Sequence, residues 1–235
     1  MLKNTLPSAA APLPAYKYLS FITASLVAVL LVSNITATKI IALGPLVFDG
    51  GTLLFPLAYI FGDVLTEVYG YRASRRVIWT GFFWVLMSAL IFQVVVLAPP
   101  AKDYPLQESF AAILGQTPRI LVASLLGYWL GEFSNSYTLA RLKVITEGRW
   151  LWLRTISSTL VGQGLDSAVF VLVAFVGLYD GELLLTMIAS NYVFKVAVEV
   201  AFTPVTYAVV GWLKRSEGVD TYDRQTNFNP FALNA

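Results

Sequence analysis

Long apolar runs recur along the whole chain, and they limit what it can fold into. A helix needs about 20 consecutive apolar residues to cross the roughly 30 Å hydrocarbon core of a bilayer. Only 13% of the residues are charged, whereas a soluble domain carries about a quarter. We therefore predict an all-α integral membrane protein, a bundle of six transmembrane helices within 18–43, 52–68, 77–97, 120–139, 156–178 and 183–213.

The basic residues separate by side when successive loops are assigned to alternating faces of the membrane. Most of the 16 Lys and Arg residues fall on one side, only Lys102 and Arg119 fall on the other, and Lys39 and Lys195 lie inside predicted spans. Because cytoplasmic loops carry the excess of basic residues, both termini are predicted to be cytoplasmic. This divides the chain into a cytoplasmic lead (1–17), a transmembrane domain (18–213) and a cytoplasmic tail (214–235). The lead lacks the apolar core of a signal peptide.

The chain contains no cysteine and no histidine. These absences argue against disulfides, thiolate chemistry, haem, zinc and histidine relays. We expect no metal and no cofactor, although carboxylates alone are able to bind hard cations. The net charge of +2 does not indicate nucleic-acid binding. No segment outside the predicted spans is long enough for a folded domain. Any function is therefore expected inside the bundle.

Five carboxylates interrupt the apolar runs. A charged side chain at the centre of a membrane-spanning helix costs about 2.5 to 3.5 kcal/mol, so such residues usually face a protein interior or a wet cavity. The two intramembrane bases cannot neutralise all five acids, and the remainder need a proton, water or a donor-rich ligand. Lys195 and Glu199, four residues apart, are expected to pair. The five acids are Asp63, Glu67, Glu132, Asp166 and Glu199.

Helical spacing groups the polar residues of the predicted spans into stripes. Residues three or four apart share one face of a helix. A lone amide in such a stripe is more often a contact between helices, and a lone aromatic ring is more often packing. Several stripes together nevertheless favour one polar site within the bundle. The stripes are Asn34 with Lys39; Tyr59, Asp63 and Glu67; Tyr128 and Glu132 with Asn135 or Ser136; Thr159, Gln163, Asp166 and Phe170; and Asn191, Lys195 and Glu199.

The longest connection between predicted spans, residues 98–119, contains four prolines around a short apolar piece at 110–114. This piece is too short to cross a bilayer. It can be a re-entrant turn or a loop element packed on the bundle, and the second interpretation is favoured.

Several distinctive motifs occur together between residue 34 and the C-terminus. They are Asn34-Ile35 with Lys39, Phe55-Pro56-Leu57-Ala58-Tyr59 with Asp63, Glu67-Val68-Tyr69-Gly70 with the basic turn 72–76, Gly162-Gln163 with Asp166 and Phe170, Lys195 with Glu199 and Pro204, and Asn227-Phe228-Asn229-Pro230-Phe231. As a set they resemble the queuosine-precursor transporter family, also called the vitamin uptake transporter family. The block in the second predicted span and the closing pentapeptide are its most specific parts.

The resemblance implies a multi-pass transporter of the bacterial inner membrane, and not an enzyme. It would import 7-deazaguanine bases such as 7-cyano-7-deazaguanine and 7-aminomethyl-7-deazaguanine for tRNA queuosine salvage. Its expected partners are this small 7-deazapurine substrate and the lipid bilayer, with no nucleic acid, and a homodimer is left open. Transport by proton coupling and transport by facilitated diffusion are both compatible with the resemblance.

The chemistry of the polar stripes suits such a ligand. A guanine-like ring presents adjacent N–H and amino donors that a carboxylate accepts, while amides complement its other groups and aromatic rings stack on it. The predicted substrate-binding residues are Asn34, Tyr59, Asp63, Glu67, Gln163, Asp166, Phe170, Asn191 and Lys195, with Lys39, Glu132 and Glu199 as a further polar pathway.

Two other functions remain open from the sequence. A substrate-binding membrane subunit for a vitamin-like heterocycle would need a separate energising module and would not transport alone in proteoliposomes. An intramembrane carboxylate enzyme would turn over its substrate in detergent. The second is less favoured, because no nucleophile or metal motif accompanies the acids.

Overall fold

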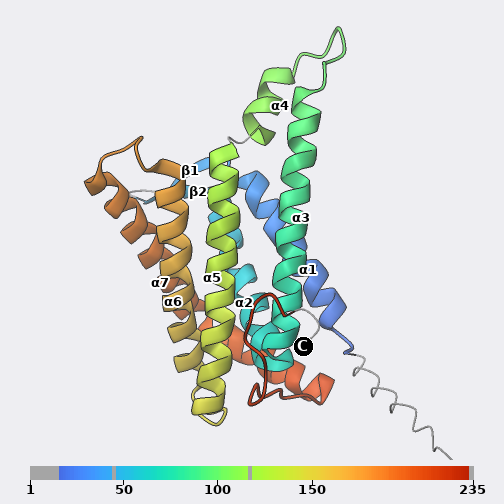
Figure 1. Cartoon of the computed structure of the whole chain (residues 1–235), viewed down its shortest axis with the longest axis vertical. Helices are drawn as coiled ribbons and strands as arrows, with labels where there is room; N and C mark the ends of the chain where they lie inside the picture. The colour runs from blue at the N-terminus through green and yellow to red at the C-terminus, as the bar shows by residue number, and fades with distance from the viewer. Residues whose placement is uncertain (1–15, 44–45, 116–117, 233–235) are drawn as a thin grey trace, which may run out of the picture.

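The computed structural model describes residues 16–43, 46–115 and 118–232, and long helices make up most of it (Figure 1). This confirms the predicted helical membrane-protein architecture. In chain order the elements are α1 (Leu19–Thr36), β1 (Ile40–Leu43), β2 (Leu46–Asp49), η1 (Gly50–Leu54), α2 (Phe55–Val64), η2 (Leu65–Tyr69), α3 (Tyr71–Leu97), α4 (Gln107–Leu114), α5 (Pro118–Ile145), α6 (Leu151–Phe175) and α7 (Gly181–Glu217).

Five stretches are long and apolar enough to cross a membrane: Leu19–Thr36, Tyr71–Leu97, Gln107–Ile145, Leu151–Phe175 and Gly181–Glu217. The predicted span 52–68 is not among them, because its helical run is divided into η1, α2 and the π-helix η2, each shorter than 18 residues. Pro56 is the second residue of α2, where the fixed φ of proline suits the first helical turn. Gly70 ends η2 with a φ of 83°, a conformation that glycine adopts without strain.

The first helix is shorter than its apolar run. α1 ends at Thr36, and β1 pairs antiparallel with β2 as a hairpin, although the apolar run continues to residue 43. The β-branched Ile40 and Ile41 favour an extended strand, which explains the early end of the helix. Lys39 therefore lies between α1 and β1 with an exposed side chain. Its predicted position inside a span was wrong.

Glycines allow α5 and α6 to approach each other closely. A Cβ added at Gly131 of α5 would lie 2.8 Å from the Cβ of Asp166 and 3.1 Å from the carbonyl oxygen of Gly162, both on α6. A Cβ added at Gly127 would lie 2.7 Å from Oδ1 of Asp166. Small residues four apart are a common way for membrane helices to pack backbone against backbone. This packing places Asp166 directly against the backbone of α5.

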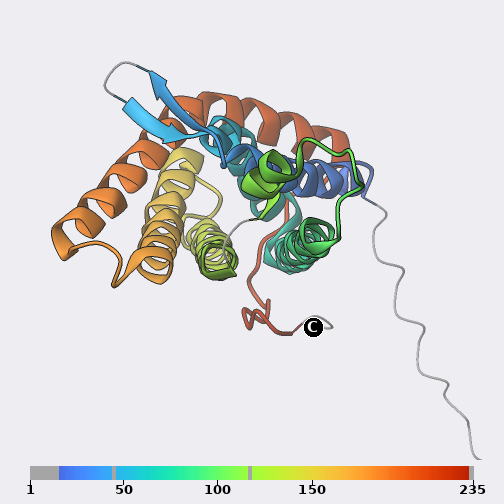
Figure 2. The same ribbon diagram turned by 90° about the horizontal axis from the view of Figure 1, so that it is seen from above.

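α7 (orange to red in Figure 2) is long enough to contact two parts of the bundle. It packs against α6 and also against α2, and the view from above shows it beside α6 in its first part. Pro204 lies inside α7, where neighbouring helices can compensate for the hydrogen bond that proline removes. Because α7 reaches both neighbours, its polar residues can meet acids from α6 and from α2.

The start of α1 and the end of α7 are joined by one side chain. The carboxylate of Glu217 accepts hydrogen bonds from the backbone N–H groups of Lys17 (2.9 Å) and Tyr18 (2.7 Å) and from the hydroxyl of Tyr69 (2.7 Å). These two ends of the bundle therefore lie together, at the end where the C-terminal tail also lies (Figure 1).

The apolar piece 110–114 belongs to α4, which lies at the opposite end of the bundle (Figure 1). None of its residues is buried. The side chain of Gln107 donates to the carbonyl oxygen of Val96 at 3.0 Å, and α4 contacts α3. This geometry corresponds to an element packed on the bundle.

Candidate functional site

Four helical elements contribute polar side chains to one cluster in the interior of the bundle. α2 provides Tyr59 and Asp63, α5 provides Glu132, α6 provides Asp166, and α7 provides Lys195 and Glu199. Tyr59 is buried and lies within electrostatic reach of all four acids. The cluster therefore joins residues that are more than 130 positions apart in the sequence. We call these six residues, together with Gln163 and Asn135, the polar cluster.

Asp63 and Glu199 form a carboxyl pair between α2 and α7. Both are 1% exposed, and each lies within hydrogen-bonding reach of the other. The amide of Asn135 donates to Asp63 Oδ1 at 3.4 Å, whereas no donor in the described part of the chain reaches Asp63 Oδ2 or Glu199 Oε1. The two carboxyl groups therefore keep acceptor atoms that no described donor uses.

Asp166 and Lys195 form an ion pair between α6 and α7, with 2.5 Å between Asp166 Oδ2 and Lys195 Nζ. Lys195 was expected to pair with Glu199 along its own helix, whereas the ion pair that it forms in the structure is with Asp166 on the neighbouring helix. The two side chains are 21% and 10% exposed. Both side chains of the pair thus keep some exposure.

Glu132 and Gln163 complete the cluster on the side of α5 and α6. A Cβ added at Gly62 of α2 would lie 3.4 Å from Glu132 Oε2, so this glycine gives the carboxylate room beside α2. Glu132 interacts electrostatically with Asp166 and with Lys195. Gln163 is 7% exposed and lies one helical turn before Asp166.

Glu67 lies outside this cluster, in a separate group of charges. It is fully buried, and its Oε1 lies 2.8 Å from Arg154 Nη2, 2.7 Å from Lys214 Nζ and 3.5 Å from Lys143 Nζ. Asp220 contacts both of the same lysines, at 2.5 Å and 2.9 Å. We call these five residues the charged anchor. All three contacts are made by Oε1, whereas no donor in the described part of the chain reaches Glu67 Oε2. Through Oε1 the anchor ties together η2, α5, α6 and α7.

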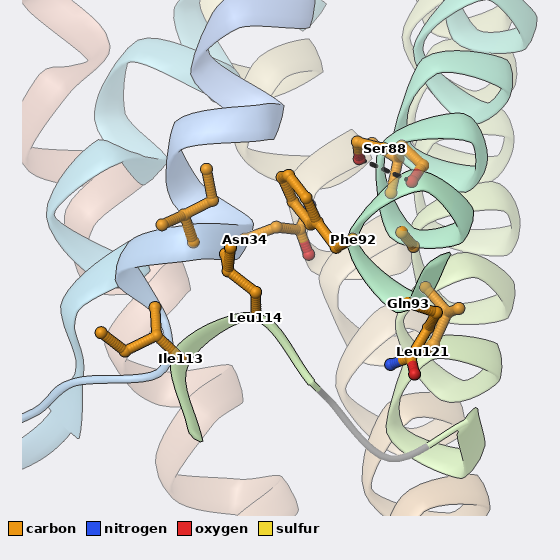
Figure 3. A pocket seen from close by; sticks show the side chains of 10 residues that line it. Asn34, Ser88, Phe92, Gln93, Ile113, Leu114 and Leu121 are labelled. Carbon is orange, nitrogen blue, oxygen red and sulfur yellow. Dashed lines mark hydrogen bonds between the residues drawn. The ribbon is translucent and has the colours of Figure 1, made fainter. Parts of the chain in front are cut away.

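The remaining predicted residues make contacts outside the polar cluster. Asn34 lies beside a cavity between α1, α3 and α4 (Figure 3), and its amide donates to the carbonyl oxygen of Leu30 at 2.9 Å. That cavity measures about 30 Å³, which suits a water molecule or two and not a purine-sized base. Asn191 donates to Met187 of its own helix at 3.0 Å, and the ring of Phe170 contacts that of Phe175.

Asn135 is the functional candidate that the predicted set omitted. It follows Glu132 by three residues, so the stripe on α5 contained the signal. Its contact with Asp63 could not be read from the sequence, because the spacing along α5 does not show which residue of another helix the amide meets. Within the residues that the structure describes, no group of three or more acidic side chains is arranged to hold a metal ion.

Comparison with known proteins gives a consistent result. Residues 49–209 match the family model described as "Putative vitamin uptake transporter". The chain is 30% identical over 186 residues to the "Probable queuosine precursor transporter" of Bacillus subtilis, covering 79% of this chain and 81% of that protein. It is 24% identical over 163 residues to the "Queuosine precursor transporter" of Escherichia coli, covering 68% and 71% of the two chains. No solved structure matches the chain significantly.

Proposed function

Because the chain belongs to the vitamin uptake transporter family, we propose that it imports queuosine precursors across the bacterial inner membrane. The substrates are 7-deazaguanine bases, such as 7-cyano-7-deazaguanine and 7-aminomethyl-7-deazaguanine. The relatives named for queuosine precursor transport support this substrate class. The matched part of the chain, residues 49–209, includes every residue of the polar cluster.

The observation that carries the proposal is the partly exposed Asp166–Lys195 pair of the polar cluster. The Watson–Crick edge of a guanine-like ring has two adjacent donors, N–H and amino, next to a carbonyl acceptor. A carboxylate accepts from both donors, and an ammonium group donates to the carbonyl. On binding, the base would replace the contact between Asp166 and Lys195: Asp166 would accept from its donors, and Lys195 would donate to its carbonyl. Neither charge would then be left without a partner.

Other members of the polar cluster orient the base. Gln163, one turn from Asp166, offers both a donor and an acceptor to the remaining ring groups. Tyr59 presents an aromatic ring on which a flat heterocycle can stack, for about 1 to 3 kcal/mol. Asp63, Glu132 and Glu199 keep this region acidic, which favours the donor-rich 7-deazaguanine over bases that present acceptors there. Glu67 has no part in binding, since it belongs to the charged anchor.

The proposed topology has six crossings with both termini in the cytoplasm. The second crossing is the composite run of η1, α2 and η2, which together cover residues 50–69. The contact of Glu217 with the start of α1 supports an even number of crossings, because it holds the first and last helices at the same end. The basic residues of the charged anchor and of the turn 72–76 lie at that end, as expected for a cytoplasmic face.

Uptake of labelled 7-cyano-7-deazaguanine by cells that lack their own route for it tests the proposal. Asp166→Asn and Lys195→Met should each reduce uptake at least about tenfold, the effect of losing a contact worth ~1.4 kcal/mol. Asn191→Ala is the matched control on α7, because that amide bonds within its own helix, and it should retain uptake. Normal uptake by both site variants, at equal abundance in the membrane, would show that the site is placed wrongly.

Reconstitution separates this proposal from the binding-subunit alternative. Purified protein in proteoliposomes should take up the labelled base without any added ATP-driven component. Unlabelled 7-aminomethyl-7-deazaguanine should compete with the labelled base, and adenine should not. Binding without any transport would identify the chain as the substrate-binding subunit of a larger transport complex.

A further inference from the structure

A lateral groove of about 850 Å³ runs between α1 and α3, apart from the polar cluster and from the charged anchor. Apolar side chains from both helices line most of its length, among them Leu19, Val27 and Leu31 of α1 and Val77 and Trp84 of α3. The two helices lie side by side in both views of the bundle (Figures 1 and 2). In a protein that spans a membrane, such a groove opens toward lipid chains.

One end of the groove is basic. Arg72 and Arg76 lie on the first turns of α3, four residues apart and therefore on one face of the helix, and both are exposed. No ion pair or hydrogen bond of either guanidinium occurs among the residues that the structure describes. Arg75, between them, is fully buried and donates to the carbonyl oxygens of Asn227 and Asn229 at 2.7 and 2.8 Å.

The length of the groove matches one leaflet of a bilayer. From Leu19 to Leu31 a helix rises about 18 Å, which is close to the ~15 Å thickness of half the hydrocarbon core. Arg72 and Trp84 are separated by the same number of residues on α3. The arginines therefore lie at the level of lipid headgroups when the apolar part of the groove lies at the level of acyl chains.

We propose that this groove binds one anionic phospholipid, with its phosphate between Arg72 and Arg76 and one acyl chain along Val27 and Leu31. Guanidinium groups bind phosphate oxygens through paired hydrogen bonds, and exposed basic residues next to membrane spans attract anionic lipids. A free phosphate would satisfy the arginines but would leave the apolar groove unused. A phospholipid satisfies both parts of the groove.

Native mass spectrometry of the purified, delipidated protein with phosphatidylglycerol or phosphatidylcholine tests this proposal. Phosphatidylglycerol should be retained as a single adduct, and phosphatidylcholine should be retained at least about tenfold less. The double variant Arg72→Gln/Arg76→Gln should lose the preference for phosphatidylglycerol. Arg215→Gln/Arg224→Gln removes two exposed charges outside the groove and is the matched control, which should bind as the parent chain does. If both double variants lost the preference for phosphatidylglycerol equally, net charge alone would explain the preference, and the proposed lipid site would be wrong.

A second variant tests the apolar half of the groove. Ala28→Trp places a large side chain at an exposed groove position of α1 without touching either arginine. It should lower phosphatidylglycerol retention at least about tenfold. Thermal unfolding of the parent chain is the second measurement: phosphatidylglycerol should raise its unfolding temperature, and inorganic phosphate should not. Equal stabilisation by phosphate, with no effect of Ala28→Trp, would mean an anion site alone. Dissociation of a dimer in these variants would instead make the groove an interface between copies, and the lipid proposal would fail.

Discussion

Glu67 and Asp166 are acidic side chains inside the bundle, yet their neighbours give them different roles. Glu67 is fully buried among Arg154, Lys143 and Lys214, all within 3.5 Å of its Oε1. Asp166 has one cationic contact, Lys195, and both partners keep some exposure. A buried acid with several cations ties helices together, whereas a partly exposed ion pair can exchange its partner for a ligand. Substitutions that lower stability and substitutions that lower transport should therefore affect different acids.

Neutralising Glu67 should destabilise the protein without changing its selectivity. Glu67→Gln leaves three cations at the anchor with Asp220 as their remaining acid, and breaking a buried pair by removing one partner costs about 3 to 5 kcal/mol. We expect a large fall in the thermal unfolding temperature in detergent. Asp166→Asn is the comparison, with a smaller fall and a loss of uptake. A Glu67→Gln protein as stable as the parent chain would contradict the structural role of the anchor.

Asp220 gives the anchor a dependence on pH. Partial burial raises the pKa of its carboxyl group, but hydrogen bonds and charge from Lys143 and Lys214 outweigh this, so the pKa lies below its usual value. An acid with a lowered pKa in the folded state stabilises the fold above its unfolded pKa of about 3.9, and this contribution is lost as the pH falls through the folded value. Asp220→Asn should thus be less stable than the parent chain by at most about 1 kcal/mol at pH 7.

The check is the difference in unfolding temperature between Asp220→Asn and the parent chain, measured at several pH values. That difference should shrink progressively below about pH 4. A constant difference across the whole range would mean that the charge of Asp220 is not what stabilises the anchor.

At the scale of elements, the polar cluster depends on how closely α5 approaches α6. Gly131→Leu should push the two helices apart, since a Cβ there would already lie 2.8 Å from the Cβ of Asp166. We expect a loss of about 1 to 3 kcal/mol in stability and a loss of uptake, because Asp166 would no longer reach Lys195 in the same geometry. Gly164→Ala is the control on α6, where an added Cβ would lie 3.6 Å from the ring of Tyr192. Equal uptake by Gly131→Leu and the control would refute this dependence.

The sequence predicted the helical membrane architecture because a membrane-spanning helix is recognised from the length and hydrophobicity of one local stretch. It did not predict the end of α1 at Thr36 or the division of 50–69 into three helical pieces, since the same apolar residues suit a helix, a strand or a π-helix. The stripes placed Asp63, Glu132, Asp166 and Glu199 on polar faces of separate helices, and the structure brings these four acids within electrostatic reach of Tyr59. They could not show that Glu67, one turn from Asp63, meets cations from three other helices, because that depends on tertiary packing.

For the molecule as a whole, one end of the bundle is held by several independent ties. The charged anchor joins four elements there, and Glu217 joins the start of α1 to the end of α7. The C-terminal tail adds a third tie, in which the carboxylate of Asp223 accepts from the backbone N–H of Tyr71 at 2.9 Å and the indole of Trp79 donates to the carbonyl oxygen of Pro230 at 2.8 Å. This end is therefore expected to resist opening, and transport requires that some of these ties be released.

The number of crossings can be measured directly, because the chain contains no cysteine and any introduced thiol is unique. Lys17→Cys, Lys102→Cys and Arg224→Cys place thiols at exposed positions before α1, between α3 and α4, and in the C-terminal tail. With six crossings and cytoplasmic termini, a membrane-impermeant maleimide should label position 102 in intact cells. Positions 17 and 224 should react only after the membrane is opened. Labelling of 17 and 224 from opposite sides would require an odd number of crossings and would exclude the composite run 50–69 as a span.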